Sequence, residues 1–324
     1  MTEPLLRSLH ARGERLTVGA LPWVAPVYRA MPQIDEVIEF PFAHGGLQWR
    51  ARRSMARTLR GRFDVAYVGP NSLKSALIPW WAGIPRRVGY LGEARYGLLN
   101  DRLPNPVGSE RPPMVAFYAA LAKPVAPVDI GAPQLRISAQ RQAADLAALQ
   151  LQAGTYFTFA PGAEFGAAKR WPVAHFAALA SQLTLPVVLL GSGKDMAVCA
   201  EIVARVRAAG GLPCIDLSGR TRLDQALSVI ANARGMVSND SGLMHVAAAF
   251  GLPQVAVFGS SSPLHTPPLN RRASILWLRD DPTYQPPLHC APCYARECQF
   301  GHTRCLQDIA PERVAAELAR QLGA

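Results

Sequence analysis

The sequence predicts an α/β protein made of two doubly wound domains. Short apolar runs of strand type alternate with segments of helical periodicity along the whole chain, which is typical of parallel sheets covered by helices on both faces. The 324 residues, 49% of them hydrophobic and 18% charged, are enough for two ordinary globular domains. A proline-rich stretch without helical period, residues 122–138, separates the two halves and indicates a linker.

Strands and helices are expected in alternation. We predict strands at residues 15–21, 35–40, 64–68, 86–90, 155–160, 186–191, 213–218, 235–238 and 254–259. Helices are predicted at residues 46–61, 72–82, 112–122, 138–150, 172–183, 195–209, 222–232, 241–250 and 311–322. We therefore expect a first domain at residues 1–125, a linker at 126–138 and a second domain at 139–324, side by side with a cleft between them.

The chain is strongly basic, with a formal net charge of +11 and a pI near 9.8, which implies an acidic partner. Arginines gather in RARRSMARTLRGR, residues 50–62, which contains no acid. On a helix, one face would carry Arg50, Arg53, Arg57 and Arg60, apart from an apolar stripe of Leu47, Ala51, Met55 and Leu59. A solvated surface and a site for an anionic ligand both remain open. Nucleic acid is not expected, because neither interleaved aromatic residues nor a reading-helix motif accompanies the charge.

No segment predicts a membrane span or a secretion signal. The longest apolar stretches, such as LPVVLLG at residues 185–191, are far shorter than the roughly 20 residues that a membrane helix needs. The first residues, MTEPLLRSLHARGERL, are interrupted by charge and lack an apolar h-region. A cytosolic enzyme is therefore the default expectation.

The segment SNDSGLMHVAAAFG, residues 238–251, predicts a turn between a buried strand and a buried helix. Asn239, Asp240 and Ser241 would lie at the helix N-terminus, where free N–H groups and the positive end of the helix dipole bind anions. Gly242 would let a ligand approach the backbone, and His245 lies one turn on from Ser241, on the same side. A simple Asp/Ser N-cap with a core histidine is the alternative interpretation.

Four more loops of small or polar residues follow predicted strands in the second half. They are PGAEFGAAKRWP, SGKD, GRT and VFGSSSP. Each alone indicates only a tight turn, but together with SNDSG they lie at the carboxyl ends of the strands, where open α/β sheets bind their ligands. Lys169 in the first loop could meet a diphosphate while backbone amides bind the remaining oxygens. The loops therefore suit a sugar nucleotide.

The cysteines fall into two groups. Cys199 and Cys214 are expected to be buried core thiols. The others form a C-x2-C-x4-C-x6-C pattern, with His289 and His302 nearby: Cys290, Cys293, Cys298 and Cys305. Such clustering suits zinc or, less well, an iron–sulfur centre, and disulfides are disfavoured in a cytosolic chain.

The motifs PGAEFGAAKRWP, NDSGLMHVAAAFG followed by VFGSSSP, PNSLKSAL and GEARYGLLND resemble the ADP-heptose:lipopolysaccharide heptosyltransferases of glycosyltransferase family nine. The last two motifs resemble the type II group in particular, which adds the second heptose of the inner core. The resemblance runs from about residue 4 to the C-terminus. It implies a GT-B fold, two Rossmann-like domains facing a central cleft, and transfer of a heptose from ADP-heptose with inversion. It also implies that no cofactor is required, so that a metal on the cysteines would be structural.

The resemblance also implies roles for individual residues. Lys169 would contact the donor phosphates and stabilise the leaving ADP, and Thr221 would contact the nucleoside. The family pattern Asp-[Ser/Thr]-Gly-x-x-His, which holds the heptose and diphosphate, is matched by Asp240, Ser241, Gly242 and His245, whereas Glu164 and Gly193 align more loosely. The acidic sugars and phosphates of a lipid A-core acceptor, at the cytoplasmic face of the inner membrane, would meet Arg50, Arg53, Arg57, Arg60, Lys74, Arg86 and Arg87.

One departure from the family pattern concerns the general base. The family begins with a strand and a Gly-Asp loop whose aspartate deprotonates the acceptor, whereas this sequence begins with MTEPLLRSLHARG, which resembles the helix after that loop. Asp35 and Asp64 lie in strand contexts and do not fit the missing loop. We expect a start assigned too late, or a shortened chain, rather than an inactive protein. Two alternatives stay open: an inactive ADP-sugar-binding protein, and another GT-B nucleotide-sugar enzyme such as an epimerase.

Overall fold

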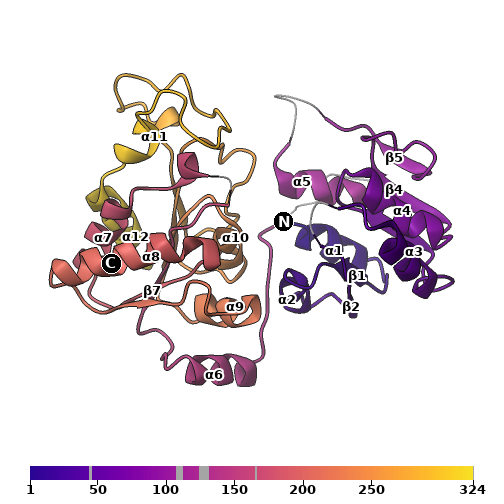
Figure 1. The fold of residues 1–324 in the computed structure, drawn as a ribbon, viewed down its shortest axis with the longest axis horizontal. Helices are drawn as coiled ribbons and strands as arrows, with labels where there is room; N and C mark the ends of the chain where they lie inside the picture. The colour runs from indigo at the N-terminus through magenta and orange to yellow at the C-terminus, as the bar shows by residue number, and fades with distance from the viewer. Residues whose placement is uncertain (44–45, 107–111, 124–130, 165, 324) are drawn as a thin grey trace. The chain divides into compact units, whose positions relative to one another are not determined.

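The computed structural model describes residues 1–43, 46–106, 112–123, 131–164 and 166–323 (Figure 1). The chain divides into two compact units, unit 1 at residues 1–131 and unit 2 at residues 132–324. The division falls inside the predicted linker 126–138, of which residues 126–130 lie outside the described ranges. Among the described residues, no helix combines the length and the apolar character that crossing a bilayer requires.

Unit 2 contains one fully parallel sheet in the order β11-β10-β9-β6-β7-β8. Its strands are β6 (Phe157–Ala160), β7 (Val187–Leu189), β8 (Cys214–Asp216), β9 (Met236–Asn239), β10 (Gln254–Val257) and β11 (Ala273–Leu276). The chain winds outward from β6 to β8 and then returns to the other side of β6 at β9. This is the doubly wound order, and its switch point lies between β6 and β9.

The helices of unit 2 cover this sheet. They are α6 (Ala139–Ala148), α7 (Val173–Gln182), α8 (Met196–Ala208), α9 (Leu223–Ala231), α10 (Gly242–Ala249), α11 (Arg304–Gln307) and α12 (Pro311–Leu322). Every residue of β6, β9 and β10 is buried, as expected for parallel strands covered on both faces. Phe159, Val237 and Val255 of these strands lie in one apolar core with residues of α7, α8 and α12.

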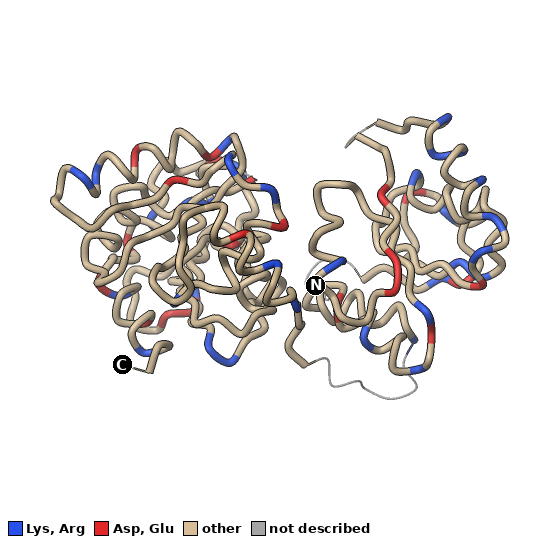
Figure 2. Tube along the Cα trace, turned by 90° about the horizontal axis from the view of Figure 1, so that it is seen from below, with Lys and Arg blue, Asp and Glu red and all other residues tan. Residues whose placement is uncertain are grey.

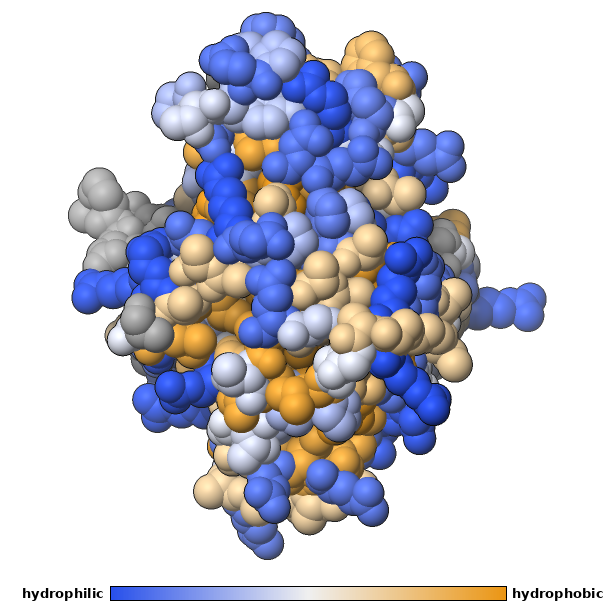
Figure 3. All heavy atoms as spheres, turned by 90° about the vertical axis from the view of Figure 1, so that its left-hand side faces the viewer, coloured by the Kyte–Doolittle hydropathy of each residue, from blue (hydrophilic) through white to orange (hydrophobic). Residues whose placement is uncertain are grey.

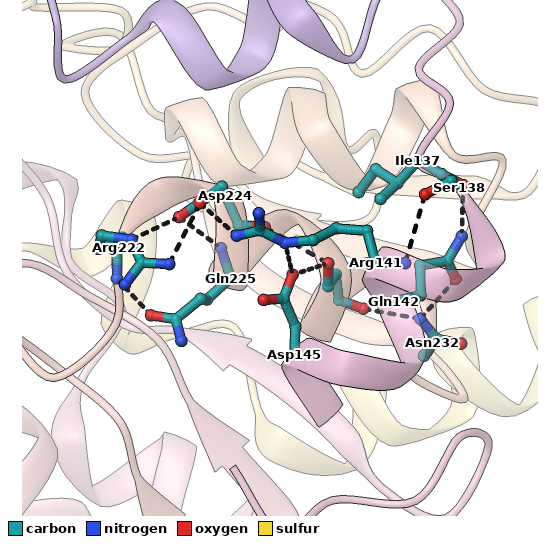
Figure 4. A network of polar contacts seen from close by, with 10 residues as sticks. Ile137, Ser138, Arg141, Gln142, Asp145, Arg222, Asp224, Gln225 and Asn232 are labelled. Atoms are coloured by element: carbon teal, nitrogen blue, oxygen red, sulfur yellow. Dashed lines mark hydrogen bonds and ion pairs between the residues drawn. The ribbon is translucent and has the colours of Figure 1, made fainter. Parts of the chain in front are cut away.

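A polar network fastens α6 to α9 (Figure 4). Arg141 of α6 lies between Asp145, 2.9 Å from its Nε, and Asp224 of α9, 2.5 Å from its Nη2. The Ser228 hydroxyl donates to the buried Asp145 carboxylate at 2.6 Å. Because the buried carboxylate has both an arginine and a hydroxyl partner, the first helix after the linker is anchored to unit 2.

Unit 1 contains two parallel sheets among its described residues. One pairs β1 (Thr17–Ala20) with β2 (Glu36–Glu39), and the other pairs β3 (Val65–Val68), β4 (Arg86–Tyr90) and β5 (Asp101–Leu103). Its helices are α1 (Glu3–His10), α2 (Ala25–Arg29), α3 (Trp49–Thr58), α4 (Leu73–Trp81) and α5 (Met114–Ala119). The pairing within each sheet is parallel throughout, so the α/β class predicted from the sequence is confirmed in both units.

The predicted strands and helices are all present, with shifted ends. The largest shift is in α3, which begins at Trp49 rather than residue 46, so Leu47 lies before the helix and is exposed rather than part of its apolar stripe. Helix α1 was expected from the resemblance of the first residues to a family helix. The elements that we did not predict are α2, β5, β11 and α11. All four are short, from three to five residues, and too brief for a repeating apolar pattern to stand out.

The surface mixes charge with small apolar patches. Lys and Arg outnumber Asp and Glu along the trace, and arginines are frequent in unit 1 (Figure 2). Figure 3 shows hydrophobic residues reaching the surface between hydrophilic ones. Single exposed apolar side chains such as Met196, Leu264 and Phe300 are ordinary for a globular protein.

Candidate functional site

A charged pair lies at the switch point of the unit 2 sheet. Lys169 comes from the loop after β6 and Asp240 directly follows β9, and the Lys169 Nζ lies 2.7 Å from the Asp240 Oδ2. The Lys169 side chain is 19% exposed and that of Asp240 is 9% exposed. The Thr266 hydroxyl donates to the other Asp240 oxygen at 3.3 Å. The pair is therefore positioned from three loops and still reaches the surface, where a ligand can approach it.

Asn239, the last residue of β9, connects that strand to the loop after β6, which carries Lys169. Its side chain is fully buried, and its Nδ2 donates to the carbonyls of Pro161 at 2.8 Å and Gly162 at 3.3 Å. Its Oδ1 accepts the Trp171 backbone N–H at 2.9 Å. Asn239 thus fixes both ends of the loop that carries Lys169. From the sequence we placed it in the polar cluster at the helix N-terminus, but we did not predict that it anchors this loop.

Helix α10 begins beside this pair. Ser241 is its N-cap, and the Ser241 hydroxyl accepts the Met244 N–H at 3.4 Å. The N–H groups of Gly242 and Leu243 open the helix, so they have no acceptor within it. Gly242 is exposed, and a Cβ built on it would meet no atom within 4 Å. Open space therefore lies over the N–H groups and positive dipole of the helix start.

His245 lies one helical turn after Ser241, and burial lowers its pKa to about 4. The imidazole is therefore neutral near pH 7, with one ring N–H to donate and one nitrogen to accept. A neutral histidine beside a helix N-terminus can hydrogen-bond a phosphate or a sugar hydroxyl without bringing a second full charge next to Lys169.

The neighbouring loops pack against the same edge of the sheet. A Cβ on Gly162 would come within 2.3 Å of the Asp195 carboxylate, so only glycine lets the turn after β7 lie against the loop after β6. Gly193 begins that turn, and the turn after β8, which holds Thr221, packs directly on it through Gly219. These turns form the β7 and β8 side of the site.

Glu164 is placed differently from the buried residues of the site. Its carboxylate lies 2.7 Å from the Lys194 Nζ, and the two side chains are 70% and 77% exposed. An ion pair this exposed contributes little to stability. The structure therefore places Glu164 on the rim of the loop rather than against Asp240, and its role toward a ligand stays a prediction.

The loop after β10 contributes buried hydroxyls. Ser260 and Ser261 are both buried, and among the described atoms their side-chain oxygens have no hydrogen-bond partner. Buried hydroxyls are usually paired, so this loop retains capacity to bind a further polar group.

In unit 1, a buried arginine joins the two motifs PNSLKSAL and GEARYGLLND. Arg95 is fully buried, and its guanidinium donates to the Pro70 carbonyl at 2.8 Å, the Asn71 side chain at 3.2 Å and the Gly92 carbonyl at 3.2 Å. Glu93 accepts the Leu73 N–H at the start of α4 at 2.7 Å. The motifs therefore meet at the carboxyl edge of β3 and β4, although we predicted no role for Arg95 from the sequence.

The arginine run divides between surface and interior. The exposed residues on α3 and just after it are Arg50, Arg53, Arg57 and Arg60, and no ion pair is formed by them among the described residues. Arg52 instead is buried, lies 4.3 Å from the Phe42 ring and donates to the Lys74 carbonyl at 3.4 Å. The exposed basic face is confirmed, and its ligand stays a prediction.

The ends of α3 lie at opposite edges of unit 1. Arg52, in its first turn, contacts Lys74 in the first turn of α4, which begins at the carboxyl edge after β3. Arg62, just past its end, pairs with Glu36, the first residue of β2, at the amino edge. The carboxyl edge therefore carries Arg50, Arg53 and Lys74, whereas Arg57 and Arg60 lie toward the amino edge.

Arg86 and Arg87 begin β4 and so lie at the amino edge as well. Arg86 pairs with Asp101 at 2.9 Å, and Arg87 donates to the carbonyls of Leu98 at 2.7 Å and Ile84 at 2.6 Å. Both side chains are thus engaged within unit 1, away from Lys74, and the structure does not bring them into one acceptor site with it. The expected acceptor site had grouped basic residues that lie at opposite edges of the sheet.

Asp35 and Asp64 also lie at amino ends of strands. Asp35 directly precedes β2 and accepts the Leu16 N–H at 2.7 Å, and Asp64 directly precedes β3. Since ligands of such sheets bind at the carboxyl ends, neither aspartate is placed to act as the catalytic base, as expected.

The two groups of cysteines are also placed apart. Cys199 is fully buried and Cys214 packs against the same core, and burial raises the pKa of each thiol to about 12. A single hollow is lined by the four others, Cys290, Cys293, Cys298 and Cys305. Among the described residues, no three Cys, His, Asp or Glu side chains already form a metal-binding group.

Comparisons with known proteins agree with this architecture. The model of glycosyltransferase family 9 (heptosyltransferase) matches residues 52–303. The lipopolysaccharide heptosyltransferase 2 of Escherichia coli strain K12 is 41% identical over 98% of this chain and 93% of its own.

Solved structures extend the likeness to the fold. The structure of the E. coli ADP-heptose lps heptosyltransferase II is similar with a TM-score of 0.84, at 39% identity over 99% of this chain and 94% of that one. A family 9 glycosyltransferase from Veillonella parvula shares the fold with a TM-score of 0.80, at 20% identity over 99% and 92% of the two chains. The predicted GT-B class is thereby confirmed. The chain belongs to glycosyltransferase family 9, the heptosyltransferases.

Proposed function

We propose that this protein transfers a heptose from ADP-heptose to the inner core of lipopolysaccharide, as the second heptose, with inversion at the anomeric carbon. The observation that carries the proposal is the Lys169–Asp240 pair at the switch point of unit 2, beside the open N-terminus of α10. A cation, free backbone N–H groups and a nearby carboxylate suit a diphosphate joined to a polyhydroxylated sugar. The relatives' printed names supply the identity of that sugar.

In this proposal the diphosphate binds between Lys169 and the start of α10. The bond from the anomeric carbon to the phosphate oxygen breaks as the bond from the acceptor oxygen forms. The acceptor hydroxyl loses its proton to water, and ADP leaves with its added negative charge. Lys169 and the N–H groups of Gly242 and Leu243 stabilise that charge, which grows in the transition state. Asp240, held by Thr266 and Lys169, accepts hydrogen bonds from sugar hydroxyls, and His245 donates one as a neutral imidazole.

The turns after β7 and β8 would receive the nucleoside. Thr221 and Gly193 lie in these packed turns, on the side of the site away from β10. The adenosine end of the donor would therefore point toward β8 and the heptose toward the loop after β10. The scheme requires no metal ion for the transfer step, since Lys169 and α10 supply the positive charge.

The acceptor would bind at the carboxyl edge of unit 1. Arg50, Arg53 and Lys74 lie there, beside the loops that Arg95 joins. Guanidinium and ammonium groups suit the acidic sugars and phosphates of a lipid A-core acceptor. The remaining exposed arginines, Arg57 and Arg60, extend the basic face of α3 and would favour peripheral contact with the anionic inner face of the membrane.

The direct test incubates the whole chain with ADP-heptose and a lipopolysaccharide acceptor that carries one heptose. Release of ADP only in the presence of acceptor, with a product heavier by one heptose, supports transfer. Tight binding of ADP-heptose without turnover would instead indicate an inactive ADP-sugar-binding protein. Conversion of ADP-heptose to an isomer without acceptor would indicate an epimerase. The anomeric configuration of the product, measured by NMR, tests inversion.

A further inference from the structure

The cysteine segment at residues 290–305 has no part in the proposed transfer reaction. It follows β11 and ends in α11, and its four cysteines all line one small hollow. Ala168 and Ser260, from the loops after β6 and β10, line the same hollow. The four thiols are therefore gathered at one place, next to two loops of the donor site.

The backbone surrounds the sulfur of Cys298. The N–H groups of Phe300, Gly301, His302 and Thr303 hydrogen-bond it, so the chain wraps around the sulfur. Backbone N–H groups around a sulfur atom are the second-shell contacts that offset the charge of a metal–thiolate site.

The two nearby histidines, His289 and His302, are less suited than the cysteines to bind a metal ion in this hollow. The His302 Nδ1 accepts the Arg304 N–H at 3.1 Å, which fixes the turn into α11, and His289 is exposed. His302 lies between Cys298 and Cys305 and lines the hollow with all four cysteines, but its Nδ1 already accepts the Arg304 N–H, and His289 does not line the hollow. The four cysteines therefore offer four sulfur donors, which suit a tetrahedral ion such as zinc.

The segment is also joined to the loop that carries Lys169. The Arg296 carbonyl accepts the Ala168 N–H at 3.1 Å, one residue before Lys169. Gly166 has φ +114°, and a Cβ there would lie 2.5 Å from the same carbonyl, so only glycine permits this approach. The Tyr294 N–H donates to the Ser260 carbonyl at 2.8 Å. Residues 294–296 thus contact both donor-site loops.

We propose that Cys290, Cys293, Cys298 and Cys305 bind one structural zinc ion, which holds residues 290–305 against the loops after β6 and β10 and so positions Lys169. Because the described side chains do not already form a metal-binding group, the sulfurs turn toward a common centre when the ion binds. Binding deprotonates the thiols and releases protons, and the closed loop of chain becomes rigid. The inference does not depend on which sugar the protein transfers.

The test begins with the whole chain purified under reducing conditions without added chelator. We expect about one zinc per chain by elemental analysis, released on titration of thiols with a mercurial and detected by a chromogenic chelator. Replacing the zinc by Co²⁺ should give the intense absorption bands of a tetrahedral cobalt–thiolate centre. The variant Cys298→Ser should lose the metal, whereas the matched control Cys214→Ser, a core thiol away from the hollow, should retain it.

A second measurement separates metal binding from misfolding. Wild-type protein stripped of zinc with a chelator should bind ADP several-fold more weakly, because the loop that carries Lys169 is no longer held in place. ADP affinity should recover when zinc is returned. Metal-free protein that stays folded and takes up neither zinc nor cobalt would overturn the proposal. Iron in place of zinc would overturn it as well. Normal zinc content with no transferase activity would leave the zinc site supported and count against the proposed function alone.

Discussion

Lys169 and Asp240 are 71 residues apart in the sequence, yet their charged atoms lie 2.7 Å apart where the unit 2 sheet reverses its order. At the switch point of a doubly wound sheet, the loops diverge and leave a crevice. Here the side chains of Lys169 and Asp240 lie in that crevice. The two side chains are partly exposed and already held in place. A diphosphate can therefore bind Lys169 while Lys169 stays close to Asp240, without a rearrangement of the loops.

Removing the lysine charge should weaken nucleotide binding. The change Lys169→Ala takes away one charge-assisted contact to the diphosphate and leaves Asp240 unpaired beside it, so we expect ADP affinity to fall about 10- to 100-fold. Asp240→Ala should lower the affinity for ADP-heptose more than the affinity for ADP, because we propose that the Asp240 carboxylate binds the sugar. Isothermal calorimetry measures both. Arg205→Ala, at an exposed ion pair on α8, is the matched control and should leave both affinities unchanged.

Filling the space over α10 should block the ligand without harming the fold. A methyl group on Gly242 meets no neighbour, so Gly242→Ala should unfold at the same temperature as the wild type or slightly higher. The same methyl group lies over the N–H groups that bind the phosphate, and ADP affinity should fall. Gly97→Ala, equally open but in unit 1, should change neither property. Unaltered ADP binding in Gly242→Ala would place the diphosphate away from α10.

Asn239 should matter for both stability and binding. Asn239→Ala leaves the Pro161 carbonyl and the Trp171 N–H without their buried partner, which should cost about 2–4 kcal/mol in the free energy of unfolding. The loop carrying Lys169 then loses its anchor and ADP affinity falls. Denaturant unfolding and calorimetry check the two effects. Asn270→Ala, which removes the partly buried bond to the Leu252 carbonyl, should cost less and leave ADP binding intact.

Acid should destabilise unit 2 through His245. Its pKa is about 4 when folded and near 6.5 when unfolded, so below about pH 6.5 the unfolded chain binds more protons. Stability should be level above that pH and fall by up to about 1.4 kcal/mol per pH unit below it. Burial also lowers the pKa of His175, so this residue makes acid destabilise the protein in the same direction. Denaturant unfolding across this pH range should show a smaller slope for His245→Gln than for the wild type.

Charge reversal on α3 should distinguish its two ends. Arg50→Glu with Arg53→Glu alters the carboxyl edge of unit 1, and we expect a higher KM for the anionic acceptor, with the difference shrinking as salt is added. Arg57→Glu with Arg60→Glu carries the same change of charge toward the amino edge and should affect KM less. ADP affinity should be unchanged in both. Equal effects of the two pairs would mean that the arginines act as a diffuse field rather than at a site.

The sequence predicted the parts of this protein that depend on local pattern. Apolar runs such as those around Phe159 and Val237 indicated buried parallel strands, and Asp240 and Ser241 indicated a helix start, because these signals lie within a few neighbouring residues. Short elements such as β5 and α2 have no such repeat and were missed.

Long-range contacts were harder to predict. Nothing near Asn239 or Arg95 in the sequence shows that each would join two loops from beneath, since their partners come from distant segments. Arg86 and Arg87 were grouped with Lys74 by charge alone, and only the strand direction separates them. Residue type and spacing thus indicated the ligand class, whereas the supporting contacts required the fold.

The most direct measurement is a crystal structure of the whole chain with ADP-heptose bound. The account predicts the diphosphate between the Lys169 ammonium and the first N–H groups of α10, with the adenosine toward Thr221 and the heptose beside Asp240. Donor density at any other place in unit 2, with Lys169 and Asp240 still paired to each other, would contradict it.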